Sequence, residues 1–304
     1  MIGQICYWLF NMSIVASFMG MIVLALRKIR VIPHRVSVFF WLIPFLRMTI
    51  PLGLNNPYSL MSLISRFTTR TVTVYDPGYD IALSATNSIM AADSYFPMTY
   101  KVDILEKVFN VAGTVWITVA LAILIALTFI YITTKREIRD SEVLKDNIYL
   151  SSKVTSPAVY GIIKPRIVLP SSYKDKELEY IVRHEKTHIR RMDNLWRILA
   201  FITASIHWFN PLSWIFLKAF LNDLELACDE MAVAGYTKEE RKEYARSLLS
   251  CSESKSMLVS AFGGAKVRTR IENVLSYKRM TWFAAVGFTV LTVIIIYTLI
   301  TNAG

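Results

Sequence analysis

Long apolar runs separated by short polar segments are the dominant pattern of this sequence. A helix needs about 20 consecutive apolar residues to cross the hydrocarbon core of a bilayer. Four runs of about this length are interpreted as transmembrane helices: 5–26, 36–54, 108–132 and 282–300. The composition agrees, since 54% of the residues are hydrophobic and only 19% are charged. The sequence therefore predicts a multi-pass protein of the cell membrane, with the lipid bilayer as its first partner.

Basic residues indicate how these helices are oriented. They cluster after the first and third runs and before the last: Arg27, Lys28, Arg30, Arg35, Lys135, Arg136, Arg139, Lys278 and Arg279. Cytoplasmic loops are enriched in Lys and Arg, so both termini are expected outside. No basic residue precedes the first run, which indicates a retained helix rather than a cleaved signal peptide. The same clusters account for the net charge of +11, and no direct binding of nucleic acid is expected.

Five segments follow from this pattern. Residues 1–54 are expected to form two transmembrane helices with a basic cytoplasmic loop, 55–106 an extracytoplasmic loop, and 107–133 a third transmembrane helix. Residues 134–281 would form a cytoplasmic domain, and 282–304 a last helix with a short external tail. The predicted fold class is a mainly α membrane protein with four transmembrane helices. An α+β domain lies between helices three and four.

The stretch that carries chemistry is His184-Glu185-Lys186-Thr187-His188, a match to H-E-x-x-H. On a helix, His184 and His188 lie on one face and can bind one metal ion. Glu185 would then take a proton from a bound water. Apolar residues at helical spacing in 174–183 and a capping box of Ser172 with Asp175 predict that helix. The alternative is a solvated helix with two chance histidines, but two of the four histidines in the chain lie in this motif.

A hydrolytic zinc site needs a third protein ligand, and residues 223–230 offer candidates. Glu225 and Asp229 are one helical turn apart: Glu225 could bind the metal, and Asp229 could accept a hydrogen bond from a ligand histidine. Cys228 is a rival ligand, although a small buried residue is the preferred interpretation. Taken alone, the segment would be an amphipathic helix with a solvated acidic face. In combination with the motif, the ligand interpretation is preferred.

The apolar run 198–221 has the length of a span but is not expected to cross. If it crossed, His184 and Glu225 would lie on opposite sides of the bilayer and could not share an ion. Asn210-Pro211 interrupts the run and predicts two short arms. A membrane-associated hairpin is therefore expected, either re-entrant or interfacial, or a helix pair beneath the domain. His207 within it is either a group that steadies an oxyanion or, preferably, a hydrogen-bonded core residue.

Other segments have simpler interpretations. Residues 158–163 and 166–169 are predicted to be short strands, and a substrate peptide could pair with their free edge. The alternative is an ordinary hairpin packed on the motif helix. Residues 236–251 are predicted to form a charged surface helix, followed by a loop at 252–266. Arg47, in the second apolar run, is either paired with a carboxylate or functional, and no catalytic role is assigned to it.

These features together resemble a known family. The motif helix, the later Glu-Leu-Ala-Cys-Asp-Glu at 225–230, and the His-Trp-Phe-Asn-Pro at 207–211 are similar to the membrane-embedded zinc metallopeptidases (gluzincin type) related to the β-lactam sensor-transducers BlaR and MecR. Residues 161–170 and 190–193 add to the resemblance. It implies His184, His188 and Glu225 as zinc ligands. It also implies Glu185 as general base and Asp229 as the residue that supports a ligand.

The resemblance implies an integral membrane zinc endopeptidase in signal transduction. The expected substrate is a cytoplasmic repressor-like protein or the enzyme itself, with self-cleavage at 259–264 as one hypothesis and a passive linker as the preferred one. A homodimer is a further expected partner. The transducers carry a penicillin-binding-like domain after the last span, whereas this sequence stops at Gly304, so sensing of β-lactams is not expected. The alternatives are a housekeeping protease of the prenyl-protease or heat-shock-protease type and a non-catalytic sensor or scaffold.

Overall fold

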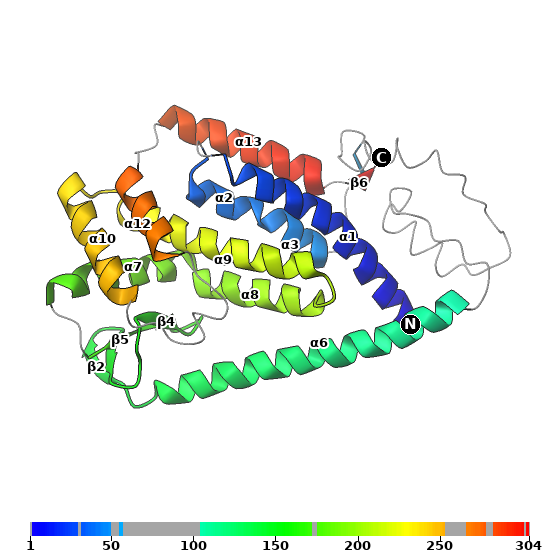
Figure 1. The fold of residues 1–304 in the computed structure, drawn as a ribbon, viewed down its shortest axis with the longest axis horizontal. Coiled ribbons are helices and arrows are strands. Elements are labelled where there is room, and N and C mark those ends of the chain that lie inside the picture. Colours follow the sequence, from blue (N-terminus) through cyan, green and yellow to red (C-terminus); the bar gives the residue numbers. More distant parts are fainter. Residues whose placement is uncertain are drawn as a thin grey trace.

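The computed structural model describes residues 2–29, 32–49, 55–56, 104–171, 175–252, 266–277, 282–300 and 302–303. The described chain is mainly helical and contains one α+β region, as the sequence predicts. Long helices run side by side, and the four-stranded sheet lies at one end of them together with α7, α10 and α12 (Figure 1).

Two helices in the described part of the chain are long and apolar enough to cross a membrane. They are α1 (Ile2–Leu26), over Ile5–Leu26, and α6 (Ile104–Glu137), over Lys107–Arg136. Half of the most apolar stretch of α1 is buried inside the protein, whereas only 6% of the corresponding stretch of α6 is buried. Since α6 exposes large apolar side chains such as Ile125 and Phe129, its surface is of the kind that lipid would cover. These helices correspond to the first and third expected spans.

The second expected span is not one continuous helix. It consists of α2 (His34–Phe40) and α3 (Leu42–Thr49), which are divided at Trp41. Pro44 lies in the first turn of α3 and has no N–H to donate to the carbonyl of Phe40, which favours a break at this point. The last apolar run forms α13 (Trp282–Ile300) over the predicted residues. The number of crossings stays a prediction.

The run 198–221 lies in a helical hairpin formed by α8 (Asp193–Ile206) and α9 (Pro211–Ala232). Asn210 caps α9 by accepting a hydrogen bond from Leu212 N–H at 2.9 Å, and Pro211 occupies the first helical position. The Asn210 amide also donates to the hydroxyls of Ser13 and Ser17 on α1, at 2.7 and 2.8 Å. The predicted division at Asn210-Pro211 is confirmed, and α9 returns to the end of the molecule from which α8 starts (Figure 1).

Two polar residues of the apolar runs are buried: His207, near the tip of this hairpin, and Arg47, in α3. The imidazole of His207 donates from Nε2 to the backbone oxygen of Met48 at 3.0 Å. His207 is therefore a hydrogen-bonded core residue, the preferred of its two interpretations. Arg47 is only 3% exposed, in keeping with an arginine that faces protein rather than lipid.

The sheet has the strand order β2-β3-β5-β4, from β2 (Glu142–Lys145), β3 (Ile148–Ser151), β5 (Arg166–Pro170) and β4 (Ala158–Tyr160). β3 and β5 are parallel, whereas β2–β3 and β4–β5 are antiparallel. Ile167 and Leu169 of the inner strand β5 are fully buried and pack against Ile181 of α7 (Asp175–Arg191). β4 ends earlier than predicted because Gly161, with φ of 91°, turns the chain. β2 and β3 were not predicted, because 134–157 was interpreted only as a polar connection.

Two further helices complete the α+β region. α10 (Lys238–Ser252) confirms the predicted surface helix, and it starts after a capping box in which Thr237 and Glu240 bond reciprocally. α12 (Val267–Ser276) was not predicted. It packs through Val274 against Tyr244 of α10 and the end of α9. A two-residue parallel pairing joins β1 (Asn55–Asn56) to β6 (Asn302–Ala303). Residues 57–103, Ser172 and the segment 259–264 lie outside the described residues, and so do the predictions made for them.

A buried ion pair holds α9 to the first two helices. Asp223 of α9 is fully buried, and Arg27 at the end of α1 donates to it from Nη2 and Nε at 2.6 and 3.0 Å. The indole N–H of Trp41, between α2 and α3, donates to the same carboxylate at 2.8 Å. A buried carboxylate without partners would be costly, so this contact fixes the position of α9 against α1 and α2.

We expect Arg27→Leu to lower the free energy of unfolding by roughly 3 kcal/mol, because it leaves the Asp223 carboxylate buried without its cation. Unfolding of the protein in detergent micelles would measure the change. Arg268→Leu is the matched control, since its partner Glu272 and its own side chain, 89% exposed, lie at the surface. Equal melting temperatures for the two variants would show that the buried pair does not hold α9.

Candidate metal centre

The two histidines of the motif lie on one face of α7, as their spacing predicts. His184 and His188 are 7% and 5% exposed, and their Nε2 atoms are 3.1 Å apart. Two imidazole nitrogens at this separation can present their lone pairs to one cation. Glu185 lies next to His184 on the same helix and is 8% exposed. The structure therefore brings the motif residues to a buried place in contact with α9.

Glu225 of α9 faces the same two nitrogens. Its Oε2 is 3.7 Å from His184 Nε2, and its Oε1 is 3.7 Å from His188 Nε2. Ligand atoms that each lie about 2.0–2.2 Å from a tetrahedral zinc ion are roughly 3.4 Å apart. The two histidines and Glu225 therefore fit a divalent metal ion, and the hairpin of α8 and α9 is what returns Glu225 to the motif helix.

Cys228 also lies beside the histidines. Among the described residues, His184, His188 and Cys228 form a buried group whose candidate ligand atoms all lie within 4.8 Å of one another. The Cys228 sulfur is 3.6 Å from Nδ1 of His184, whereas Glu225 faces Nε2 of that ring. Two different third ligands, Glu225 and Cys228, are thus available beside the two histidines.

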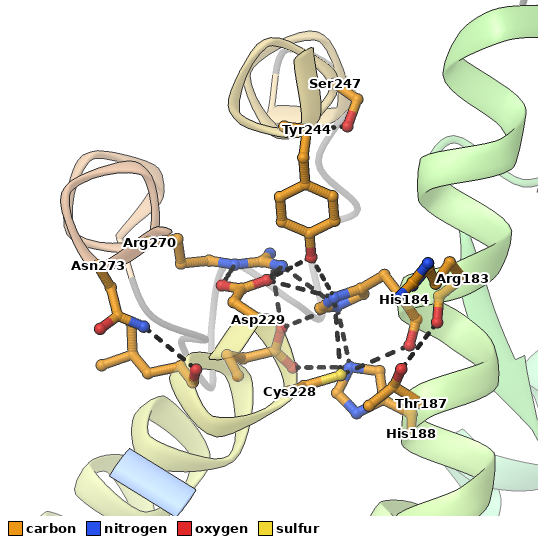
Figure 2. A network of polar contacts seen from close by, with 12 residues as sticks. Arg183, His184, Thr187, His188, Cys228, Asp229, Tyr244, Ser247, Arg270 and Asn273 are labelled. Atoms are coloured by element: carbon orange, nitrogen blue, oxygen red, sulfur yellow. Dashed lines mark hydrogen bonds and ion pairs between the residues drawn. The ribbon is translucent and has the colours of Figure 1, made fainter. Parts of the chain in front are cut away.

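Figure 2 shows the groups that hold His184 from its outer edge. Its Nδ1 is 2.8 Å from the hydroxyl of Tyr244 and 3.3 Å from Oδ1 of Asp229. Tyr244 in turn donates to Asp229 Oδ1 at 2.7 Å. The sequence predicted this place for Asp229. It did not predict Tyr244, which α10 contributes from a segment interpreted only as a charged surface helix.

Asp193 holds His188 in the same way. Its Oδ2 is 2.6 Å from His188 Nδ1, and its side chain is 1% exposed. Asp193 begins α8, directly after Met192, whose φ of 55° turns the chain sharply at the end of the motif helix. A carboxylate on the outer nitrogen fixes the orientation of a metal-binding imidazole and raises its basicity. Asp193 belongs to the segment 190–193 that carries part of the family resemblance, but no role was predicted for it.

Two arginines neutralise the carboxylates. Arg270 of α12 donates from Nε and Nη2 to the two oxygens of Asp229, both at 2.8 Å, and its Nη1 is 3.5 Å from Oε2 of Glu225. Its Nη2 also lies 3.1 Å from Nε2 of His184. Arg197 of α8 donates to Oε1 of Glu225. Neither arginine was predicted, because each comes from an element without a local motif.

The charged groups of the site lower the pKa values of its carboxylates and raise the pKa of His188. Burial alone would raise the pKa of Asp229, but Arg270 and His184 lower it to about 2. Burial would also raise the pKa of Glu225, which His188, His184 and the two arginines bring well below its usual value. For His188, burial alone would lower the pKa, whereas Cys228, Glu225 and Asp193 raise it to about 9. The same negative groups would attract a divalent cation.

A family model described as BlaR1 peptidase M56 matches residues 7–274. The methicillin resistance protein mecR1 of Staphylococcus aureus is 31% identical over 144 residues, which is 44% of this chain and 25% of that protein. The regulatory protein BlaR1 of Bacillus licheniformis is 26% identical over 162 residues, 50% of this chain and 27% of that protein. The match therefore spans about a quarter of the length of each relative.

We expect Tyr244→Phe to lower the free energy of unfolding by about 2 kcal/mol, because it removes a buried hydrogen bond to the charged Asp229 and keeps the ring. Thermal unfolding would measure the change. Tyr180→Phe is the control, since that ring packs edge-on against Tyr244 in the same cluster. If both variants unfold at the same temperature, the Tyr244 hydroxyl does not organise the site.

Proposed function

The chain belongs to the BlaR1 peptidase M56 family, and from this premise we propose that it is an integral membrane zinc endopeptidase that acts in signal transduction. The observation that carries the proposal is the convergence of two imidazole nitrogens and one carboxylate. The Nε2 atoms of His184 and His188 are 3.1 Å apart, and Glu225 lies 3.7 Å from each. This is the donor set of a hydrolytic zinc site of the His₂Glu type.

His184, His188 and Glu225 would hold the ion. When bound, zinc supplies a Lewis acid that polarises the scissile carbonyl and makes water acidic near neutral pH. Asp193 and Asp229 keep each imidazole turned so that Nε2 faces Glu225. Arg197 and Arg270 hold the Glu225 carboxylate in place and compensate the negative charge of the site.

Glu185 is the proposed general base. A carboxylate oxygen of Glu185 accepts the proton of the attacking water and then delivers it to the leaving amine nitrogen. Its burial, at 8% exposed, supports this role because proton transfer within a dry site is not diverted to bulk solvent. The peptide bond is thereby replaced by a carboxylate and an amine, with one water consumed.

We further propose four membrane crossings, with both termini outside and residues 134–281 in the cytoplasm. Figure 1 supports this arrangement, because the sheet, α7, α10 and α12 lie at the end of the molecule where α1 and α6 finish. Basic residues such as Lys28 and Lys135 flank this end. The broken pair α2 and α3 would be the second crossing, and α8 with α9 a re-entrant or interfacial hairpin.

The names of the relatives, a methicillin resistance protein and regulatory proteins, support a regulatory role. We propose as substrate a cytoplasmic repressor-like protein or the enzyme itself, and as a further partner a second copy of this chain in a homodimer. Because the match covers about a quarter of each relative, the inducing signal is not carried over from them.

One observation favours a second candidate. His184, His188 and Cys228 form a compact buried group, and thiolate ligands are typical of structural zinc sites. In that case the protein would be a non-catalytic membrane sensor or scaffold. Zinc content and activity of four variants separate the two candidates.

We expect Glu185→Ala to retain about one zinc ion per chain but to lose roughly a factor of 100 to 10,000 in peptide hydrolysis, since the base is removed and the ligands remain. Glu225→Ala should lose both zinc and activity. Asp229→Ala should lose about 10- to 100-fold in metal affinity or activity, because it supports His184 without binding the ion. Metal analysis and a proteolysis assay on the purified protein measure both properties.

Cys228→Ser is the matched control and should keep zinc and activity. The reverse pattern, in which Cys228→Ser loses zinc and Glu225→Ala keeps it, would support the structural site and the scaffold. An active Glu185→Ala variant would contradict the proposed mechanism.

Orientation is tested by thiol labelling in intact cells. Cys6 and Cys251 are first replaced by serine, and the fully buried Cys228 is retained. A cysteine at exposed Lys238 should resist an impermeant reagent, because α10 is proposed to lie in the cytoplasm, whereas a cysteine at Asp80 should react. Labelling at Lys238 and not at Asp80 would invert the proposed topology.

A further inference from the structure

A pocket opens beside His188, between β4, the turn that follows it and the corner where α7 meets α8. It has about 270 Å³ of empty space, including its open mouth. Apolar side chains form most of its wall: Val159, Ile162, Pro165, Ile189, Met192 and Leu195. His188 and Asn194 supply its polar part. Nothing in the proposed chemistry of hydrolysis requires this pocket, so its shape needs another explanation.

The position of the pocket relates it to the metal centre. His188 lines the pocket and, through Nε2, also faces Glu225. Successive residues of an extended peptide are about 3.3 Å apart. A peptide whose scissile bond lies at Nε2 of His188 would therefore place the side chain of a neighbouring residue at the pocket.

The free edge of the sheet beside the pocket is partly occupied. Among the strands of the described residues, β4 pairs only with β5. The backbone oxygens of Val159 and Gly161 point to the other side, and the Asn194 amide donates to both, at 2.9 and 3.2 Å. A strand added here would compete with Asn194 for these acceptors. Asn194 therefore restricts backbone pairing along 159–161. Recognition of a peptide then depends more on the pocket, which would hold one of its side chains.

The corner that forms the pocket also holds the metal centre. Met192 has a φ of 55°, a conformation that costs a non-glycine residue free energy and persists where the surrounding structure requires it. This turn lets Asp193 reach His188, and it leaves Met192, 54% exposed, at the wall of the pocket. The same strained corner therefore sets the orientation of His188 and the width of the pocket.

We propose that this pocket binds one aliphatic side chain, of about the size of valine or leucine, from the peptide residue next to the scissile bond. The inference rests on the proposed peptidase function and specifies its substrate class. An apolar wall favours such a side chain, whereas a carboxylate would lose its hydration without gaining a cation among the residues that line the pocket. Leu195 is the wall residue whose size the test varies.

The test uses the full-length protein, loaded with zinc, and two kinds of probe. The first is a set of quenched peptides that differ only in the residue on one side of the scissile bond: Gly, Ala, Val, Leu, Phe or Asp. The second is a set of dipeptide hydroxamates with hydrogen, isobutyl or benzyl side chains, whose affinity is measured without turnover. Leu195→Ala and Leu195→Trp widen and narrow the pocket. Leu199→Ala and Leu199→Trp are the controls, one turn further along α8 and 44% exposed.

The wild-type protein should prefer Val or Leu over Gly by about tenfold or more in kcat/KM, and isobutyl over hydrogen in affinity, because one methylene in an apolar pocket discriminates by roughly 10- to 200-fold. Leu195→Ala should move both preferences toward Phe and benzyl. Leu195→Trp should move them toward Ala or Gly and hydrogen. The Leu199 variants should keep the wild-type profile. Met192→Ala repeats the widening at an exposed position if Leu195→Ala does not fold.

The two probes separate the pocket from the peptidase. If no peptide is cut but hydroxamate affinity still shifts with Leu195, the pocket stands and the proposed hydrolysis fails. If peptides are cut while neither probe responds to Leu195 or Met192, the pocket is not the specificity site. If neither cutting nor side-chain-dependent binding is found, both proposals are overturned.

Discussion

The arrangement of this protein depends on four carboxylates of one helix, α9, three of them buried and one partly buried. Asp223, Asp229 and Glu230 are at most 6% exposed, and the Glu225 side chain is 16% exposed. Carboxylates at such places are costly unless cations or N–H groups compensate them, so each requires a partner from elsewhere in the chain. Arg27 from α1 pairs with Asp223, Arg197 from α8 with Glu225, and Arg270 from α12 with Asp229. Glu230 accepts from backbone N–H groups at the start of α2, at 3.0 and 3.2 Å.

These pairs make α9 a rigid connection between the apolar helices and the metal centre. Asp223 contacts Arg27 at the end of α1. Glu225, two residues further along α9, faces the histidines of α7. Asp229 and Glu230, adjacent in sequence, contact α12 and α2 respectively. Because a helix moves as a unit over this length, a displacement of α1 and α2 against the rest would shift a proposed metal ligand together with its supporting carboxylate. α9 therefore connects the proposed site directly to the apolar helices.

The sequence predicted the parts of the site that local periodicity determines. His184 and His188 on one face of a helix, and Glu225 one turn before Asp229, follow from helical spacing alone, and the structure brings them together. Asp193, Tyr244, Arg197 and Arg270 could not be assigned, because their partners are set by how distant elements pack. α12 was not predicted although Val267, Ile271 and Val274 recur at helical spacing, because residues 267–276 were given no interpretation. β2 and β3 were missed because each has only four residues and β2 is exposed along its whole length. The break at Trp41 was not predicted, although Pro44, which favours it, lies within the run 36–54.

The choice between Glu225 and Cys228 as third ligand follows from the two distinct nitrogens of His184. Nδ1 is already engaged by Tyr244 and Asp229, and Cys228 lies on this side of the ring. If Cys228 and Nδ1 of His184 bound one ion, the ion would displace the Tyr244 hydroxyl from Nδ1. The fully buried Asp229 would then have weaker hydrogen-bond partners, which is costly. An ion between the Nε2 atoms and Glu225 leaves every outer hydrogen bond intact, because Asp193 and Asp229 already hold both rings from behind. The contact it replaces is the one between Arg270 Nη2 and Nε2 of His184, and Arg270 keeps its paired bonds to Asp229. The hydrogen-bond network thus supports the proposed choice of Glu225 as third ligand.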